Sequence, residues 1–187
     1  MRRGRNQLLV YIALLVAQGA VISLLERMIP TPFVFAPGAK LGLANVITLI
    51  AIFTLPKRQS FQVVGLRILV TLLLGGTFSM FLYSATGAIV SYVMMLAVKQ
   101  LGPKRVSVIG ISIFGGMMFN VGQIAVAAWL SQSWQIFNYL PWLSFAGILA
   151  GAAVGVVAYY LLHHNQALRQ YHEQLIQQYH EQNWLND

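Results

Sequence analysis

The sequence predicts an all-α membrane protein, a bundle of six transmembrane helices, and two observations carry this prediction. The first is composition: 58% of the 187 residues are hydrophobic and only 9% are charged, whereas a soluble domain carries about 25% charged residues. The second is patterning, because six apolar runs follow one another along the chain. Runs of this kind are typical of membrane spans.

The first apolar run covers residues 8–25 and follows a basic lead. That lead, the apolar stretch and the small residues at 17–20 together resemble a secretory signal with its cleavage site. Because five further apolar runs follow, we interpret this segment as an uncleaved first helix.

A proline-rich segment separates the first two expected helices and holds Pro30, Pro32 and Pro37. Proline fixes φ and removes a backbone donor, so the chain is extended here. We expect a structured outer loop that shapes a pocket, and a rigid connector is the alternative. The second expected helix runs from about 38 to 55.

Four more helices are expected before the tail. They cover about 61–74, 78–98, 106–130 and 142–162. The loop 131–141 carries aromatic residues, which suit a membrane interface.

The last segment, 163–187, is expected to form a polar cytoplasmic tail beside a transmembrane domain at 1–162. Apolar residues at helical spacing predict a C-terminal amphipathic helix that lies on the membrane or on a partner. These residues are Leu168, Tyr171, Leu175, Ile176 and Tyr179. His172 and His180 lie about 12 Å apart along such a helix, too far to share one metal ion, and we expect both at the surface.

Basic residues predict the orientation in the membrane. The net charge is +8 at pH 7, and in a six-helix arrangement most basic residues fall on one side, with only Arg27 and Lys40 on the other. The basic side comprises Arg2, Arg3, Arg5, Lys57, Arg58, Lys99, Lys104, Arg105 and Arg169. The positive-inside rule then predicts a multi-pass protein of the cell membrane with both termini in the cytoplasm.

The scarcity of carboxylates argues against catalysis. Asp and Glu number four in total; Asp187 ends the chain, and only Glu26 lies near the expected bundle. Paired-carboxylate catalysis and magnesium–diphosphate chemistry both need more than this. The sequence also lacks a phosphate-binding loop, a nucleophile elbow and any cysteine. We therefore expect no enzyme, no cofactor and no metal site.

Polar side chains within the apolar runs point instead to binding, because such groups are costly in a bilayer and tend to be functional. Lys40 stands at the expected start of the second helix, where a helix N-terminus favours anions; snorkelling to the headgroups is the alternative. The other candidate substrate-binding residues are Asn45, Thr48, Tyr83, Asn120 and Gln123. The side-chain amides of Asn45, Asn120 and Gln123 could instead bond neighbouring backbone groups.

Three further charged residues are interpreted differently. Glu26 and Arg27 are expected to pair with each other or to cap the pocket. Arg67 is expected to snorkel or to bond carbonyls at a helix end, so it is not placed in the site.

The segment Pro37-Gly-Ala-Lys-Leu-Gly-Leu-Ala-Asn45, after a proline-rich loop, resembles the signature of the Gx transporter family. Members of that family are often labelled heptaprenyl diphosphate synthase component I and resemble the substrate-binding S components of energy-coupling factor (ECF) transporters. The resemblance covers about residues 8–162. It implies a six-helix bundle that captures a small molecule outside and works with a transmembrane coupling subunit and two ATPase subunits. The AxxxA pattern of Ala13 and Ala17 matches the segment that contacts the coupling subunit in S components.

The resulting prediction is an integral membrane S-component-like subunit that imports a small molecule, such as a vitamin or a quinone precursor. Two alternatives remain. One is a non-catalytic accessory subunit of heptaprenyl diphosphate or menaquinone biosynthesis, since the chain lacks the Asp-rich motifs of prenyl synthases. The other is a scaffold of a membrane redox complex.

Overall fold

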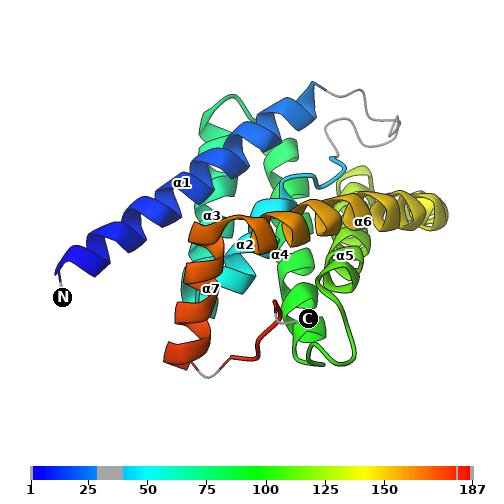
Figure 1. The fold of residues 1–187 in the computed structure, drawn as a ribbon. Coiled ribbons are helices and arrows are strands. Elements are labelled where there is room, and N and C mark those ends of the chain that lie inside the picture. The colour runs from blue at the N-terminus through cyan, green and yellow to red at the C-terminus, as the bar shows by residue number, and fades with distance from the viewer. Residues whose placement is uncertain (1, 29–39, 180, 186–187) are drawn as a thin grey trace.

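The computed structural model describes residues 2–28, 40–179 and 181–185, and in this part of the chain every regular element is helical (Figure 1). The elements are α1 (Arg2–Arg27), α2 (Asn45–Thr54), α3 (Lys57–Leu73), α4 (Phe78–Lys99), α5 (Val108–Ser131), the 3-10 helix η1 (Trp134–Tyr139), α6 (Leu140–His164) and α7 (Gln166–Tyr179). The all-α prediction is therefore confirmed for the described residues.

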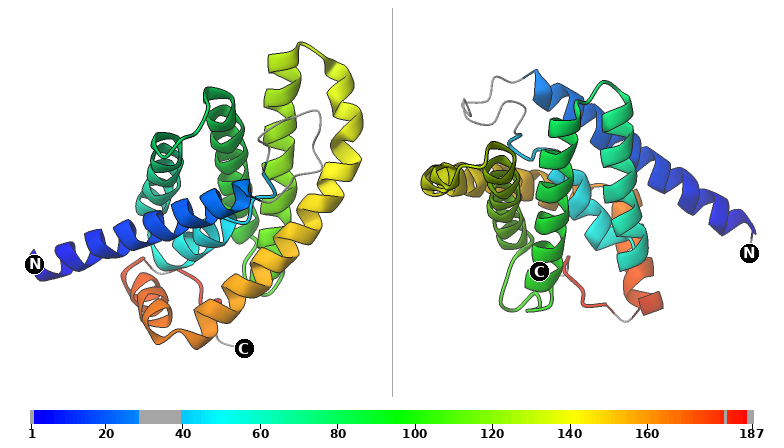
Figure 2. Two further views of the ribbon diagram at one scale, coloured as in Figure 1. Left: turned by 90° about the horizontal axis from the view of Figure 1, so that it is seen from above. Right: turned by 180° about the vertical axis from the view of Figure 1, so that it is seen from behind.

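Among the described residues, four helical segments are long and apolar enough to cross a membrane, whereas the sequence predicted six transmembrane helices. They are Asn6–Arg27, Phe78–Lys99, Val108–Ser131 and Trp134–His164. Figure 1 shows the α3–α4 turn and the end of α1 at one end of the bundle, and the α4–α5 connection and α7 at the other. The N-terminal part of α1 extends away from the other helices (Figure 2).

Helix α2 forms the centre of the fold, and all ten of its residues are buried. Ten residues span about 15 Å, half of the hydrocarbon core of a bilayer. The expectation of a longer helix from residue 38 is wrong for the described part, because residues 40–44 are not helical. Gly42 has a φ of +88°, a left-handed conformation that glycine adopts without steric cost. The backbone therefore turns at Gly42 before α2 begins.

Glycines allow α5 and α6 to approach closely. A Cβ atom on Gly147 would lie 2.7 Å from the carbonyl oxygen of Gly116, and one on Gly151 would lie 2.7 Å from that of Ser112. A Cβ on Gly155 would meet the Cα of Ile109 at 2.8 Å. The small-residue ridge of α6 thus serves packing inside the bundle.

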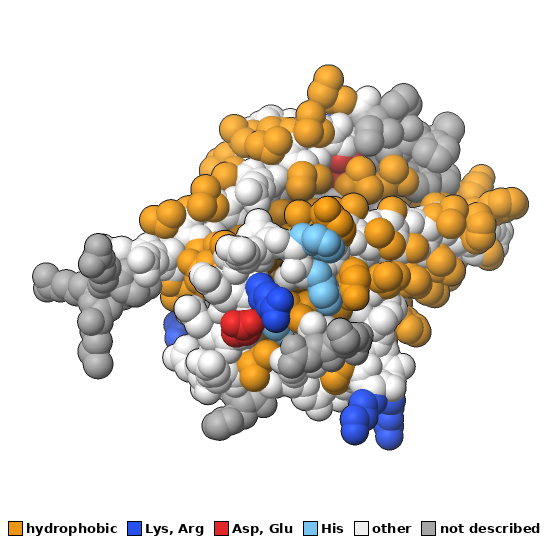
Figure 3. Space-filling model, in the orientation of Figure 1, with side chains coloured by type: hydrophobic (Ala, Val, Ile, Leu, Met, Phe, Trp, Pro, Cys, Tyr) orange, Lys and Arg blue, Asp and Glu red, His pale blue; other side chains and the backbone are white. Residues whose placement is uncertain are grey.

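Much of the outer surface is apolar. In Figure 3, hydrophobic side chains gather over α1 and α6, while the lower part of that face carries more polar and charged groups. Exposed apolar residues on these helices include Leu9, Leu14, Val21, Phe145, Leu149 and Val157. This distribution fits helices that face lipid.

Helix α7 folds back onto the bundle instead of standing free. The ring of Tyr171 stacks on that of Tyr11 with centroids 4.0 Å apart, and Leu175 is buried. The amphipathic helix is present, and part of its apolar side packs on its own chain, while Tyr179 is exposed. Contact of this helix with the membrane or with a partner stays a prediction. The expectation of a surface histidine is wrong for His172, which is 1% exposed; His180 lies outside the described residues.

Candidate functional site

A small cavity lies where the end of α1, residues 40–45 and helices α3, α4 and α5 meet. Its polar lining includes Glu26, Lys40, Asn45, Arg67, Thr71 and Ser84. The volume is about 20 Å³, which is room for about one water molecule. Charged groups from three separate segments therefore converge on one small cavity.

Glu26, at the end of α1, holds the connection that leads into α2. Its side chain is 2% exposed, and its carboxylate accepts hydrogen bonds from the N–H groups of Gly42 and, at 3.1 Å, Leu43. Hydrogen bonds to a charged acceptor are stronger than neutral ones. The left-handed turn at Gly42 presents these two N–H groups to one carboxylate.

Two cations share the cavity with this single carboxylate. Arg67 is 4% exposed and donates to the carbonyl of Ala44. Its aliphatic stem lies over Gly19, where a Cβ atom would come within 2.6 Å of the Arg67 Cδ. Lys40 is 5% exposed, and its ammonium forms no hydrogen bond or ion pair with any described residue. The lining therefore carries an excess of positive charge.

Two amides on α5 hold the backbone of Lys40 in place. The Gln123 side chain accepts from the Lys40 N–H at 2.7 Å and donates to the Lys40 carbonyl at 2.8 Å. Gln123 also donates to Asn120 at 3.1 Å, and Asn120 donates to the carbonyl of Leu143 at 2.7 Å. Both amides thus bond protein groups: Gln123 holds the backbone of Lys40, and Asn120 supports Gln123.

The remaining predicted residues are distributed unevenly. Asn45 lines the cavity and donates to the Ser91 hydroxyl at 3.4 Å, while its Oδ1 is buried without a partner among the described residues. The hydroxyl of Thr48 is likewise buried and unpaired within the described chain. Tyr83 lies in a separate apolar cluster with Leu143 and Ile136. Of the predicted set, the structure brings only Lys40 and Asn45 into the cavity lining.

The structure also places the other charged residues. Arg67 bonds a backbone carbonyl at the start of α2, as expected, and it also lines the cavity, so we add it to the candidate site. An ionisable residue inside an apolar run is a functional candidate by default, and that signal was present. Of the two alternatives for Glu26 and Arg27, mutual pairing is not seen in the described residues: Glu26 lines the cavity and accepts from backbone N–H groups, and Arg27 donates to the Thr71 carbonyl at 2.8 Å. The three prolines of the expected outer loop lie outside the described residues.

The AxxxA residues lie away from the cavity. Ala13 and Ala17 are both exposed, on a face of α1 that also exposes Val10, Leu14 and Val21. This face has no partner among the described residues of the chain, so it is accessible to lipid or to another subunit.

A family model described as heptaprenyl diphosphate synthase component I matches residues 15–161. The chain belongs to this family. The family is non-catalytic although its name mentions a synthase. Comparison with curated proteins gave no significant match, and neither did comparison with solved structures. Helix α7 lies beyond the matched range.

Proposed function

We propose that this member of the heptaprenyl diphosphate synthase component I family is the substrate-binding subunit of an importer and takes up a small molecule that carries an anionic group. A vitamin or a quinone precursor with a carboxylate or a phosphate fits this description. The observation that carries the proposal is the buried excess of positive charge formed by Lys40 and Arg67 against Glu26.

Burial makes this excess costly. A charge removed from water must be paired and hydrogen-bonded, or it destabilises the fold. Arg67 has a backbone partner, and one oxygen of Glu26 accepts from two N–H groups, whereas the ammonium of Lys40 donates no hydrogen bond to a described residue. An anionic group of the substrate would supply that partner. Phe119 and Ile68 also line the cavity and would contact an apolar part of the same molecule.

The cavity must enlarge to admit such a molecule, because about 20 Å³ holds one water and no vitamin. We propose that the hydrogen bonds from the N–H groups of Gly42 and Leu43 to Glu26 keep the cavity small. A substrate anion would compete with Glu26 for these donors. In the proposed mechanism, entry of the anion frees the connection before α2 from α1 and opens the site.

Import also needs partners, because the sequence contains no phosphate-binding loop for ATP. We propose a transmembrane coupling subunit with two ATPase subunits, as in ECF transporters. The exposed face around Ala13 and Ala17 supports this, since small residues let helices approach closely in a membrane. The proposal includes six membrane crossings and cytoplasmic termini.

The family name favours a second candidate function. An accessory membrane subunit of heptaprenyl diphosphate synthesis would bind a soluble synthase subunit instead of a transported solute. Co-purification with that synthase, and loss of its activity without this chain, would support this candidate over import.

Ligand binding by the purified full chain tests the import proposal. The measurement is the thermal shift of the protein in lipid nanodiscs with a panel of anionic vitamins and quinone precursors, each beside an uncharged analogue. One lost charge-assisted bond corresponds to about 1.5–3 kcal/mol, so Lys40→Met should weaken binding by roughly 10- to 100-fold. The control is Arg58→Met, at an exposed position. No shift with any compound, or equal affinity of both variants, would contradict the proposal.

A further inference from the structure

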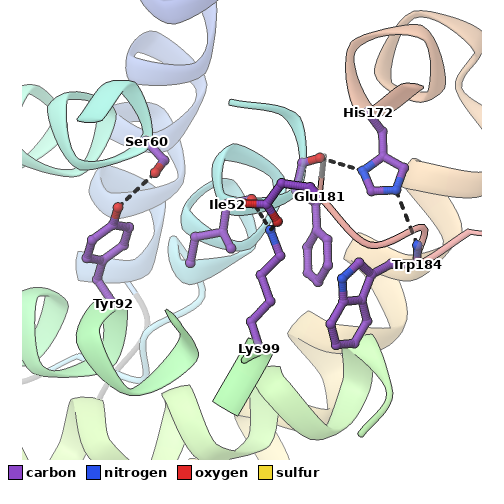
Figure 4. Close-up of polar contacts among 8 residues, drawn as sticks. Ile52, Ser60, Tyr92, Lys99, His172, Glu181 and Trp184 are labelled. Atoms are coloured by element: carbon purple, nitrogen blue, oxygen red, sulfur yellow. Dashed lines mark hydrogen bonds and ion pairs between the residues drawn. The ribbon is translucent and has the colours of Figure 1, made fainter. Parts of the chain in front are cut away.

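The end of α2 opposite the cavity is capped by distant parts of the chain. The last carbonyls of a helix have no partners within the helix and form the negative end of its dipole. Here Lys99 of α4 donates to the carbonyl of Ile52 at 3.1 Å, and His172 of α7 hydrogen-bonds the carbonyl of Phe53 at 2.6 Å. Figure 4 shows both groups meeting at this helix end.

The segment 181–185 covers these caps. Glu181 pairs with Lys99 at 2.8 Å, and the backbone N–H of Trp184 donates to His172 Nε2 at 3.4 Å (Figure 4). The indole of Trp184 lies edge-on to Phe53, with ring centroids 5.4 Å apart. Trp184 and Leu185 are both buried, so the segment seals the end of α2 with an aromatic side chain.

This seal is held by few polar contacts. The ion pair is partly exposed, with Glu181 at 27%, and such pairs contribute little net stability. The hydrogen bond from the backbone N–H of Trp184 to His172 is long, and the buried indole Nε1 of Trp184 has no partner among the described residues. An unsatisfied buried donor costs about 1–3 kcal/mol. Segments with so few supporting bonds open locally at low free-energy cost.

We propose that residues 181–185 form a releasable latch over the end of α2, and that protonation of His172 opens it. The latch is built from contacts separate from the cavity at the start of α2. Its release uncovers Phe53 and leaves the carbonyl end of the central helix without its aromatic cover.

The two hydrogen bonds of the His172 ring explain why its protonation controls the latch. A carbonyl only accepts, so Nδ1 carries the proton toward Phe53, and Nε2 must be unprotonated to accept from Trp184. Protonation turns Nε2 into a donor that faces the backbone N–H of Trp184, which is also a donor, so this hydrogen bond is lost. Protonated His172 also places a second positive charge near Lys99.

The charges around His172 act in both directions. Burial lowers the pKa of His172 below its ordinary value and is the largest influence. The Phe53 carbonyl raises the pKa, Lys99 of α4 lowers it, and Glu181 of the latch and Glu173 of α7 raise it. The latch is consequently closed at neutral pH and opens only in acid, below the usual pKa of histidine, about 6.5.

Tryptophan fluorescence tests the latch directly. Trp184 is 6% exposed, whereas Trp129, Trp134 and Trp142 are at least 70% exposed. Replacement of these three by Phe leaves Trp184 as the sole reporter in the full chain. We expect blue-shifted emission protected from iodide at pH 7.5, and at least a threefold larger iodide quenching constant at pH 5. Circular dichroism and size-exclusion chromatography check that the bundle stays folded.

Matched variants separate the latch from general loosening. In the Trp184-only background, His172→Gln should remove the pH dependence, and Glu181→Gln should shift opening to higher pH. Glu173→Gln, in an exposed pair with Arg169, is the control and should shift the midpoint less than Glu181→Gln. The chain lacks cysteine. Leu96 lines one pocket together with Glu181 and Trp184 of the latch, so Leu96→Cys gives a second readout through maleimide labelling at each pH. Quenching and labelling that do not change from pH 7.5 to 5, or a pH response kept in His172→Gln, would overturn the proposal.

Discussion

Removal of the Glu26 carboxylate should destabilise the fold more than loss of any other acidic side chain in the described residues. In Glu26→Ala, the N–H groups of Gly42 and Leu43 lose their acceptor, and each buried unsatisfied donor costs about 1–3 kcal/mol. Lys40 and Arg67 also lose a nearby negative charge in the cavity lining, although neither forms an ion pair with Glu26. These contributions overlap, so we expect a total loss of about 3–5 kcal/mol.

Glu26→Gln separates hydrogen bonding from charge. The amide keeps an oxygen that can accept from Gly42 and Leu43 but loses the negative charge, so we expect a smaller loss of about 1–3 kcal/mol. The assay is thermal unfolding of the full chain in nanodiscs, where 1 kcal/mol corresponds to about 2–4 °C in a domain of this size. Glu26→Ala should therefore lower the midpoint by roughly 6–20 °C.

The control for this series is Glu173→Ala, because Glu173 is 52% exposed and pairs with the exposed Arg169. Surface changes of this kind stay within about 0.5 kcal/mol. If Glu26→Ala unfolded at the same temperature as the control, the hydrogen-bonded closure of the cavity would be refuted. If Glu26→Gln were as unstable as Glu26→Ala, charge alone would hold the site, and the proposed competition for the two N–H groups would fail.

Three further predictions follow from contacts elsewhere. Gly151→Ala should be about 1–3 kcal/mol less stable than Gly65→Ala in thermal unfolding, because a Cβ on Gly151 meets backbone at 2.7 Å and one on Gly65 meets nothing within 4 Å; equal stability would contradict the tight α5–α6 contact. Gln123→Ala should speed amide hydrogen exchange at Lys40 at least tenfold, and unchanged exchange would argue against the amide bridge. Because burial lowers the pKa of His172, its stabilising contribution should be complete above about pH 6.5 and fall as the pH drops through the lowered value, with His172→Gln flattening the profile.

The sequence alone predicted most helices and several of their ends. The expected range 78–98 agrees with α4 at Phe78–Lys99, and 142–162 agrees with α6 at Leu140–His164. Helix ranges are predicted well where long apolar runs are bounded by charges or by glycine and proline, because this information is local in the sequence. Polarity alone also selected Lys40 and Asn45, since a polar group in an apolar run needs a specific reason to be there.

The tertiary structure decided which polar groups meet. Lys40 and Gln123 are 83 residues apart and share two hydrogen bonds, and no local pattern indicates that pairing. The same holds for His172, which the tail sequence placed at the surface and which caps Phe53, 119 residues earlier.

Sequence therefore determined that this protein is helical, apolar and poor in carboxylates, because those properties follow from residue type and spacing. Only the fold showed that α2 begins at Asn45, and that Glu26, Lys40 and Arg67 lie in one cavity. The reason is physical: a buried charge or a helix end is stabilised by whichever partner the packing of distant segments brings within hydrogen-bonding distance.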